Sequence, residues 1–208
     1  MSTQCAVDLS MSAEKDNVFD PMNTLLTAQT SRPPQFKSVD MHTLTPFQRA
    51  LMTIDGTVTK FIEAYTMEHV LVTRISQTEQ VIGNEFTWLE VEKDSPVTVR
   101  EVYLHGEQSQ TIHAYAVTLI APDMLNNSVD EGLKTQGGSV GRLLRSSKME
   151  TYREFLWYGS QRFENLPEPL SSFNGKDFLS RTYRIISDGK PIMMINENFP
   201  LHRQDESL

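Results

Sequence analysis

The sequence predicts an α+β fold, an antiparallel sheet with helices packed on one side of it and across its ends. Two observations carry this prediction. Short strand-like runs follow one another closely in the middle of the chain, with turn-forming residues between them. The chain then ends with two strand-like runs on either side of Asp188-Gly189, a dipeptide that favours a tight hairpin turn. No internal repeat is visible, and 208 residues suffice for one domain with a substantial core.

The first 41 residues are expected to form a poorly ordered leader. They are rich in Ser, Thr, Gln, Asn and Asp, they show no persistent apolar period, and Pro33-Pro34 would break a helix. We therefore expect one folded domain over residues 42–202, followed by a polar tail over residues 203–208.

Two short helices should open this domain. Thr45 is a favourable N-cap and Pro46 suits the first helical position, so a helix is expected over residues 47–54. After a break, residues 57–65 are expected to form a second helix. The four strands that should follow are closely spaced, which favours an antiparallel meander. They cover residues 69–76, 85–92, 97–105 and 111–120.

Two more helices should follow the meander. Pro122 opens the first, over residues 123–133, and Ser139 caps the second, over residues 140–146. Beyond them the pattern is less regular. Residues 149–163 fit a strand or a helix, residues 165–180 are typical of a loop, and the final hairpin pairs residues 182–187 with 190–199.

The composition excludes several classes of protein. There are 27 Asp and Glu against 19 Lys and Arg, a formal net charge of -8, and such a surface repels nucleic acid and anionic membranes. Cys5 is the only cysteine, and the five histidines lack the spacing of metal ligands, so we expect no bound metal. No signal peptide or membrane-spanning run is visible. We expect a cytoplasmic monomer whose partner is a small molecule.

Two ionisable residues stand where apolar side chains belong. Because side chains alternate along a strand, Arg100 shares its face with Val102 and Leu104, and Glu197 shares its face with Ile195. A buried charge costs roughly several kcal/mol unless it is paired or hydrogen-bonded. Either the two residues form a cross-strand salt bridge, or they face a pocket in which Arg100 binds an acid group and Glu197 handles a hydroxyl or a proton.

A glycine-rich stretch, GGSVGR at residues 137–142, precedes and opens the last predicted helix. Backbone amides at a helix start attract anions, although a simple capped loop explains the same residues. Lys60, near the start of the second helix, could likewise assist an anion or point into solvent. Nearby basic residues could draw in an anionic substrate or form a solvated helix face; they are Arg142, Arg145, Lys148 and Arg153.

Four segments together resemble the chorismate lyase (chorismate pyruvate-lyase) family, in its bacterial branch with longer N-terminal segments. DGTVTK at residues 55–60 resembles the segment after the family's first helix, and VREVYL at 99–104 resembles its Arg-Glu strand. SVGRLL at 139–144 resembles a helix start, and residues 183–199, including Glu197, resemble the C-terminal hairpin. The likeness covers residues 45–200.

The resemblance implies that flap-like segments and the sheet enclose an internal ligand pocket. It implies removal of pyruvate from chorismate, which leaves 4-hydroxybenzoate, with no metal or organic cofactor. The product would enter aromatic biosynthesis that leads to quinones, glycolipids or secondary metabolites. Slow release of this flat anion from a buried site would cause product inhibition.

The resemblance also implies residue roles. Arg100 would bind the ring carboxylate, and Glu197 would contact the 4-hydroxyl and assist proton movement, so these two are the expected catalytic residues. The other expected substrate-binding positions, including those of the glycine-rich stretch and the second helix, are Val58, Lys60, Val140 and Gly141. Two alternatives stay open: a non-catalytic module that binds a small aromatic acid, and a related lyase or isomerase acting on another small carboxylate.

Overall fold

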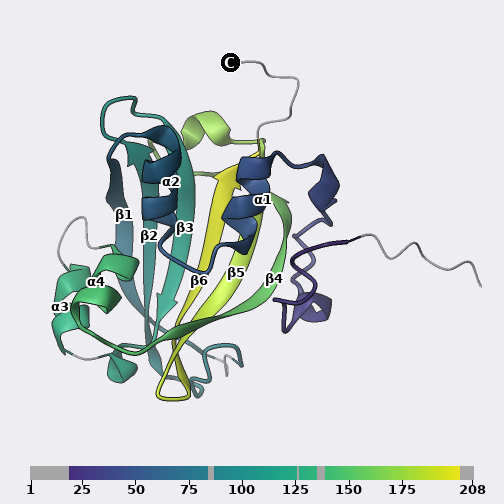
Figure 1. Ribbon diagram of the computed structural model, residues 1–208. Coiled ribbons are helices and arrows are strands. Elements are labelled where there is room, and N and C mark those ends of the chain that lie inside the picture. The colour runs from purple at the N-terminus through teal and green to yellow at the C-terminus, as the bar shows by residue number, and fades with distance from the viewer. Residues whose placement is uncertain (1–18, 84–86, 126, 135–138, 202–208) are drawn as a thin grey trace, which may run out of the picture.

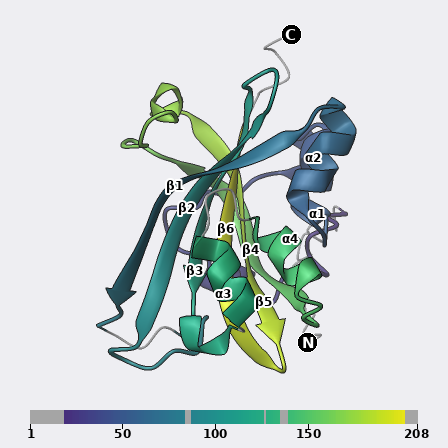
Figure 2. The same cartoon turned by 90° about the vertical axis from the view of Figure 1, so that its left-hand side faces the viewer.

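The computed structural model describes residues 19–83, 87–125, 127–134 and 139–201, and it confirms the predicted α+β fold (Figure 1). Its described strands form a six-stranded antiparallel sheet in the order β1-β2-β3-β6-β5-β4. The α-helices lie on one side of this sheet (Figure 2). The strand bounds are Val70–Val81 (β1), Pro96–Gly106 (β2), Ile112–Ile120 (β3), Tyr152–Arg162 (β4), Asp177–Ser187 (β5) and Lys190–Pro200 (β6).

The two helices predicted at the start of the domain are confirmed as α1, Pro46–Thr53, and α2, Val58–Thr66. Thr45 and Gln48 form a reciprocal capping box at the start of α1, which satisfies backbone donors that lack partners within the helix. Helix α2 ends where Met67 adopts a left-handed backbone. Both helices bury apolar side chains in one cluster against the sheet.

One predicted strand is wrong. Residues 87–90 form turns, and residues 84–86 lie outside the described part of the chain. Glu90 has a positive φ angle of 53°, which extended backbone does not allow. The apolar side chains that suggested a strand, such as Leu89 and Val91, are instead buried in a small cluster with Val97.

The C-terminal hairpin has the predicted turn but longer strands. Asp188 and Gly189 both have left-handed φ angles, 50° and 75°, as a two-residue hairpin turn of type I′ requires. Strand β5 begins at Asp177, so the loop predicted over residues 165–180 is wrong in its last four positions. Before it lies a short 3-10 helix, Ser171–Phe173 (η4). The ambiguous stretch over residues 149–163 contains edge strand β4.

The helix predicted over residues 123–133 is divided. It consists of a 3-10 helix, Pro122–Met124 (η3), and helix α3, Asn127–Lys134, with residue 126 outside the described residues. Helix α4, Val140–Ser146, confirms the next prediction. Ser139 occupies its N-cap position, but among the described residues its side chain makes no capping hydrogen bond. The glycines at 137–138 lie outside the described residues.

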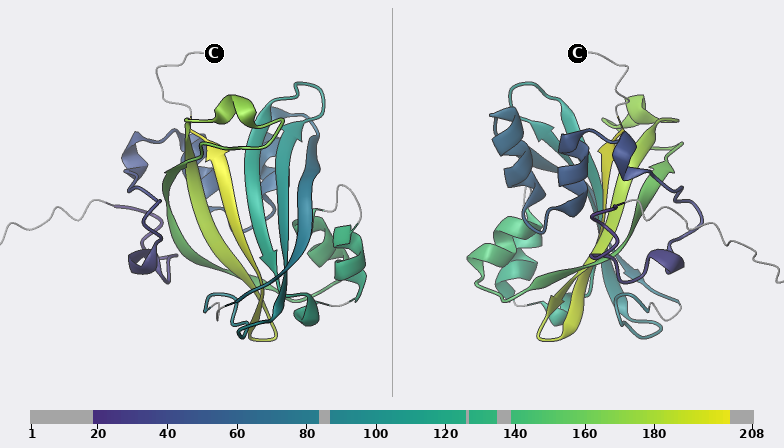
Figure 3. Two further views of the ribbon diagram at one scale, coloured as in Figure 1. Left: turned by 180° about the vertical axis from the view of Figure 1, so that it is seen from behind. Right: turned by 45° about the vertical axis from the view of Figure 1, so that its right-hand side comes forward.

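The structure describes the leader from residue 19, and its residues 26–37 pack against β4, contrary to the expectation of poor order to residue 41 (Figure 3). Leu26 and Lys37 form isolated bridges with Phe155 and Ser160 of β4. The side-chain amide of Gln29 also bonds to the backbone of β4, and Met22 is fully buried. An edge strand has unpaired backbone groups, and this segment supplies partners for them. Its 3-10 helices are Gln29–Ser31 (η1) and Met41–Thr43 (η2).

Residues 1–18 and 203–208, the rest of the leader and the expected tail, lie outside the described residues. No helix within the described ranges is long and apolar enough to cross a membrane.

Candidate functional site

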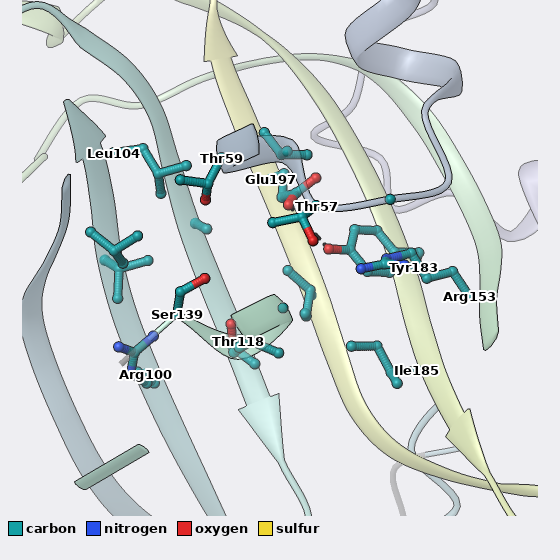
Figure 4. A pocket seen from close by; sticks show the side chains of 18 residues that line it. Thr57, Thr59, Arg100, Leu104, Thr118, Ser139, Arg153, Tyr183, Ile185 and Glu197 are labelled. Atoms are coloured by element: carbon teal, nitrogen blue, oxygen red, sulfur yellow. Dashed lines mark hydrogen bonds between the residues drawn. The ribbon is translucent and has the colours of Figure 1, made fainter. Parts of the chain in front are cut away.

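A cavity lies between the helix-covered face of the sheet and the first turns of α2 and α4 (Figure 4). The cavity volume is about 70 Å³, and a cavity needs about 10–15 Å³ for each water molecule, so several would fit. Its walls are mainly apolar, with a few polar and charged side chains, as is typical of small-molecule sites. The apolar side chains are Val58, Val72, Val102, Leu104, Ala116, Val140, Ile185 and Ile195, and the charged ones are Arg100, Arg153 and Glu197.

Arg100 reaches this cavity from β2, where the strand phase places it on the same face as Val102 and Leu104. Only 1% of its surface is exposed. Burial lowers the pKa of Arg100 to about 10, and the positive charge of Arg74 lowers it in the same direction. The guanidinium is therefore still charged near neutral pH, in surroundings that an anionic ligand would improve.

Glu197 reaches the same cavity from β6. Its partner is Arg181, directly opposite on β5, with Nε and Nη2 both 2.9 Å from Oε2. The hydroxyl of Tyr183 donates a hydrogen bond of 3.0 Å to Oε1. Strand β3 lies between β2 and β6, so Glu197 and Arg100 are not the cross-strand pair of the first interpretation. Both residues line one cavity, so their positions agree with the alternative that they face a shared pocket.

Arg181 is the part of the site that the sequence analysis missed. It is fully buried, and its Nη1 donates to the carbonyl oxygens of Met52 at 3.0 Å and Ile54 at 2.9 Å, at the end of α1. Alternation along β5 puts it on one face with Tyr183 and Ile185, the same signal that identified Arg100. Arg181 was not identified because the predicted strand began at residue 182, one residue after it.

The first turns of α2 and α4 meet at the cavity. Val58 and Val140 both line it, and the first backbone amides of a helix have no partner within that helix. Gly141 allows this approach, because a Cβ built on it would lie 3.1 Å from Oγ1 and 3.2 Å from Cγ2 of Thr57. Three of the four expected binding positions beyond Arg100 and Glu197 are therefore at the cavity.

Lys60 is not among the residues that line the cavity. Its side chain is 61% exposed and pairs with Glu63, one turn along α2. The structure therefore does not support a substrate contact by Lys60, and it favours the solvated interpretation. The reason is helical phase: Lys60 lies two positions after Val58, on a different side of the helix.

The four residues of the predicted basic cluster also differ in whether they reach the cavity. Arg142 and Lys148 are exposed. Arg145 lines a neighbouring hollow on the surface and donates a 3.0 Å hydrogen bond to the hydroxyl of Thr57. Arg153 alone of the four lines the internal cavity.

Comparison with known proteins identifies a family. A profile of the family described as "Chorismate pyruvate-lyase Rv2949c-like" matches residues 52–205. The chain is 27% identical over 157 residues to the chorismate pyruvate-lyase of Mycobacterium leprae, with 73% of this chain and 72% of that protein covered. It is 28% identical over 160 residues to the chorismate pyruvate-lyase of Mycobacterium tuberculosis, with 73% and 78% covered.

Solved structures show the same fold at low sequence identity. PhnF from Mycobacterium smegmatis matches with a TM-score of 0.55 and 13% identity, covering 75% of this chain and 67% of that one. The effector domain of PhnF matches with a TM-score of 0.53 and 13% identity, covering 73% of this chain and 90% of that one. At this identity the likeness concerns the fold alone.

Proposed function

Because this chain belongs to the Rv2949c-like chorismate pyruvate-lyase family, we propose that it cleaves chorismate to 4-hydroxybenzoate and pyruvate. One observation carries the proposal beyond family membership. A buried cation, Arg100, and a carboxylate, Glu197, line the same apolar cavity. A ring with a carboxylate at one end and a hydroxyl at the other matches that arrangement in charge and in hydrogen-bonding capacity.

The reaction needs no co-reactant. The ether bond between the ring and the enolpyruvyl group breaks, and the hydrogen on the hydroxyl-bearing ring carbon leaves, so the ring becomes aromatic. The departing enolpyruvate takes up a proton on its methylene carbon and becomes pyruvate. Aromatisation supplies the driving force, so the protein has to hold the substrate in a reactive shape and exclude water.

Arg100 would bind the ring carboxylate through its planar guanidinium. The first-turn amides at Val58 and Val140 would complete the carboxylate site, supported by the positive ends of α2 and α4. Support comes from the positions of all three residues on the cavity wall, with Gly141 letting the two helix starts approach closely.

Glu197 would accept a hydrogen bond from the substrate hydroxyl and assist the movement of the ring proton. Its two oxygens already accept from Arg181 and Tyr183, but each carboxylate oxygen has a second acceptor site. These two partners orient the carboxylate before the ligand arrives. Arg181 and Tyr183 are therefore positioning residues in this proposal, whereas Arg100 and Glu197 are catalytic.

The proposal is tested by incubating the purified protein with chorismate and separating the products by chromatography. Equal amounts of 4-hydroxybenzoate and pyruvate are expected. Binding of 4-hydroxybenzoate without turnover would overturn the proposal in favour of a non-catalytic aromatic-acid module, and turnover of another small carboxylate alone would favour a related lyase or isomerase. Glu197→Gln should lower kcat more than it raises KM.

Product inhibition is expected as well, because Arg100 would hold the flat anionic product in a buried apolar cavity. Calorimetric titration should give a dissociation constant for 4-hydroxybenzoate below the KM for chorismate. Equal affinity for substrate and product would contradict tight retention of the product.

A further inference from the structure

Arg153 of β4 is a second guanidinium on the cavity wall. Its side chain is 19% exposed. It also lines the neighbouring surface hollow, which shares Gly56, Thr57 and Gly141 with the cavity. Arg153 therefore stands where the internal cavity meets the surface hollow, a place that a side group of a bound ring could reach.

The contacts of Arg153 hold it in place but leave bonding capacity. Its Nη1 lies 3.5 Å from Oδ1 of Asp55, an exposed carboxylate, so this ion pair is long and contributes little. The centre of its guanidinium lies 5.7 Å from the centre of the Tyr183 ring. Its Nε is buried and has no hydrogen-bond partner among the described residues. A buried donor of this kind is costly unless a ligand supplies the acceptor.

The sheet order places Arg153 away from Arg100. Strands β3, β6 and β5 lie between β2, which carries Arg100, and β4, which carries Arg153. Figure 4 shows the two arginines on opposite sides of the cavity, with Arg153 next to Tyr183. Because Tyr183 donates to Glu197, Arg153 belongs to the Glu197 side of the site.

The substrate proposed above has a matching second anion. Chorismate carries one carboxylate on the ring, opposite the hydroxyl, and a second on the enolpyruvyl group, which is attached next to the hydroxyl. With the ring carboxylate at Arg100 and the hydroxyl at Glu197, the second carboxylate lies on the Glu197 side. Resting on the proposed function, we infer that Arg153 binds the enolpyruvyl carboxylate, a contact that chorismate can make and the monocarboxylate product cannot.

Arg153→Gln tests this inference, because it removes the charge and keeps a polar side chain. The value of kcat/KM for chorismate should fall about 10- to 100-fold, the range for a lost charge-assisted hydrogen bond, mainly through KM. The dissociation constant of 4-hydroxybenzoate should change less than about 3-fold, which also shows that the cavity has folded. Arg153→Lys should restore part of the loss, since it returns the charge without the planar fork.

Arg162→Gln is the matched control. It lies on the same strand and pairs with Asp177 at 2.9 Å on the surface, so it loses an ion pair and a charge far from the cavity. Its kinetics should equal those of the wild type. If Arg153→Gln weakens chorismate and 4-hydroxybenzoate equally, Arg153 only shapes the cavity and the inference is wrong. Unchanged chorismate kinetics would overturn it too.

A stable dicarboxylate separates this inference from the proposed function. The probe is 3-(carboxymethoxy)-4-hydroxybenzoate, which carries an ether-linked carboxylate next to its hydroxyl and cannot lose pyruvate. Wild-type protein should bind it more tightly than Arg153→Gln does, by the same 10- to 100-fold, about the value of one charge-assisted bond. If the wild type binds the probe more tightly but does not cleave chorismate, the proposed function is wrong and the inference about Arg153 stands. If wild type and Arg153→Gln bind the probe equally, the inference is wrong, whether or not chorismate is cleaved.

Discussion

The charged residues at the two ends of the cavity have opposite surroundings. At one end, burial and the neighbouring charge of Arg74 both disfavour the cationic form of Arg100 and lower its pKa to about 10. At the other end, the carboxylate of Glu197 is neutralised by Arg181, which is itself tied to the end of α1. An anion bound at the first end would favour the cationic form of Arg100, whereas at the second end Glu197 is paired with Arg181 before any ligand binds.

This difference indicates how the structure divides stability and binding. The network around Glu197 joins β6, β5 and the end of α1, so we expect it to stabilise the fold and to hold the carboxylate in one orientation. Burial and the charge of Arg74 disfavour the cationic form of Arg100, and a bound carboxylate would favour it. The two arginines should therefore respond differently to the same substitution.

Arg181→Met should give the largest effect. It leaves the Glu197 carboxylate without its cation and two carbonyl groups without a donor, so the free energy of unfolding should fall by about 3–5 kcal/mol. Urea denaturation measures this loss. The control Arg162→Met removes an exposed pair and should cost less than about 1 kcal/mol. Similar losses in the two variants would mean that the buried network does not stabilise the fold.

Arg100→Met should have the next largest effect, on binding rather than on folding. The affinity for 4-hydroxybenzoate should fall by about 2–5 kcal/mol, because a buried charge pair with the ligand is lost. The free energy of unfolding should fall less than in Arg181→Met, because the substitution also removes the desolvation of Arg100 and its repulsion from Arg74. Calorimetric titration and urea denaturation give the two values. If this variant unfolds as readily as Arg181→Met, the two ends do not differ.

Tyr183→Phe should have a smaller effect that depends on pH. Burial raises the pKa of Tyr183, and the negative charge of Glu197 raises it further. A tyrosine in the unfolded chain ionises near about pH 10, whereas this one stays protonated in the folded state. The stability from its hydroxyl is therefore full below about pH 10 and is lost as the pH rises towards the folded pKa.

Urea denaturation checks this expectation. Below about pH 10, Tyr183→Phe should lower the free energy of unfolding by about 1 kcal/mol, and the gap from the wild type should shrink at higher pH. Tyr65→Phe is the control for loss of an exposed tyrosine hydroxyl, because Tyr65 is 64% exposed, and it should change the free energy of unfolding by less than about 0.5 kcal/mol. A constant gap for Tyr183→Phe would contradict the proposed role of burial.

Gly141→Ala should have the smallest effect. The new Cβ would lie 3.1 Å from the hydroxyl oxygen of Thr57, so the starts of α2 and α4 should move apart by a few tenths of an ångström. The affinity for 4-hydroxybenzoate should fall about 3- to 10-fold, because the amides that would bind the carboxylate move, at about 1 kcal/mol for a weakened hydrogen bond. Gly83→Ala is the control, since no described atom lies within 4 Å of its added Cβ. Unchanged affinity would show that this end tolerates the shift.

Local pattern was sufficient for much of the site. Strand phase alone identified Arg100 and Glu197, because a charged residue on an apolar face stands out at a period of two. The capping signal at Thr45 and the turn at Asp188-Gly189 were also correct, since both depend on a few adjacent residues. The apolar segment over residues 85–92 was misread because an apolar run does not reveal whether its backbone is extended.

The sequence by itself determined which strand and helix faces are apolar and which charges lie on them, because these follow from the short periods of helices and strands. Only the tertiary structure decided that Arg181 neutralises Glu197, that Arg153 joins the cavity while Lys60 stays outside, and that residues 26–37 cover the edge strand β4. The physical reason is that these contacts join segments far apart in the chain. They depend on the order of strands in the sheet and on where each helix ends, and neither leaves a periodic trace in the residues concerned.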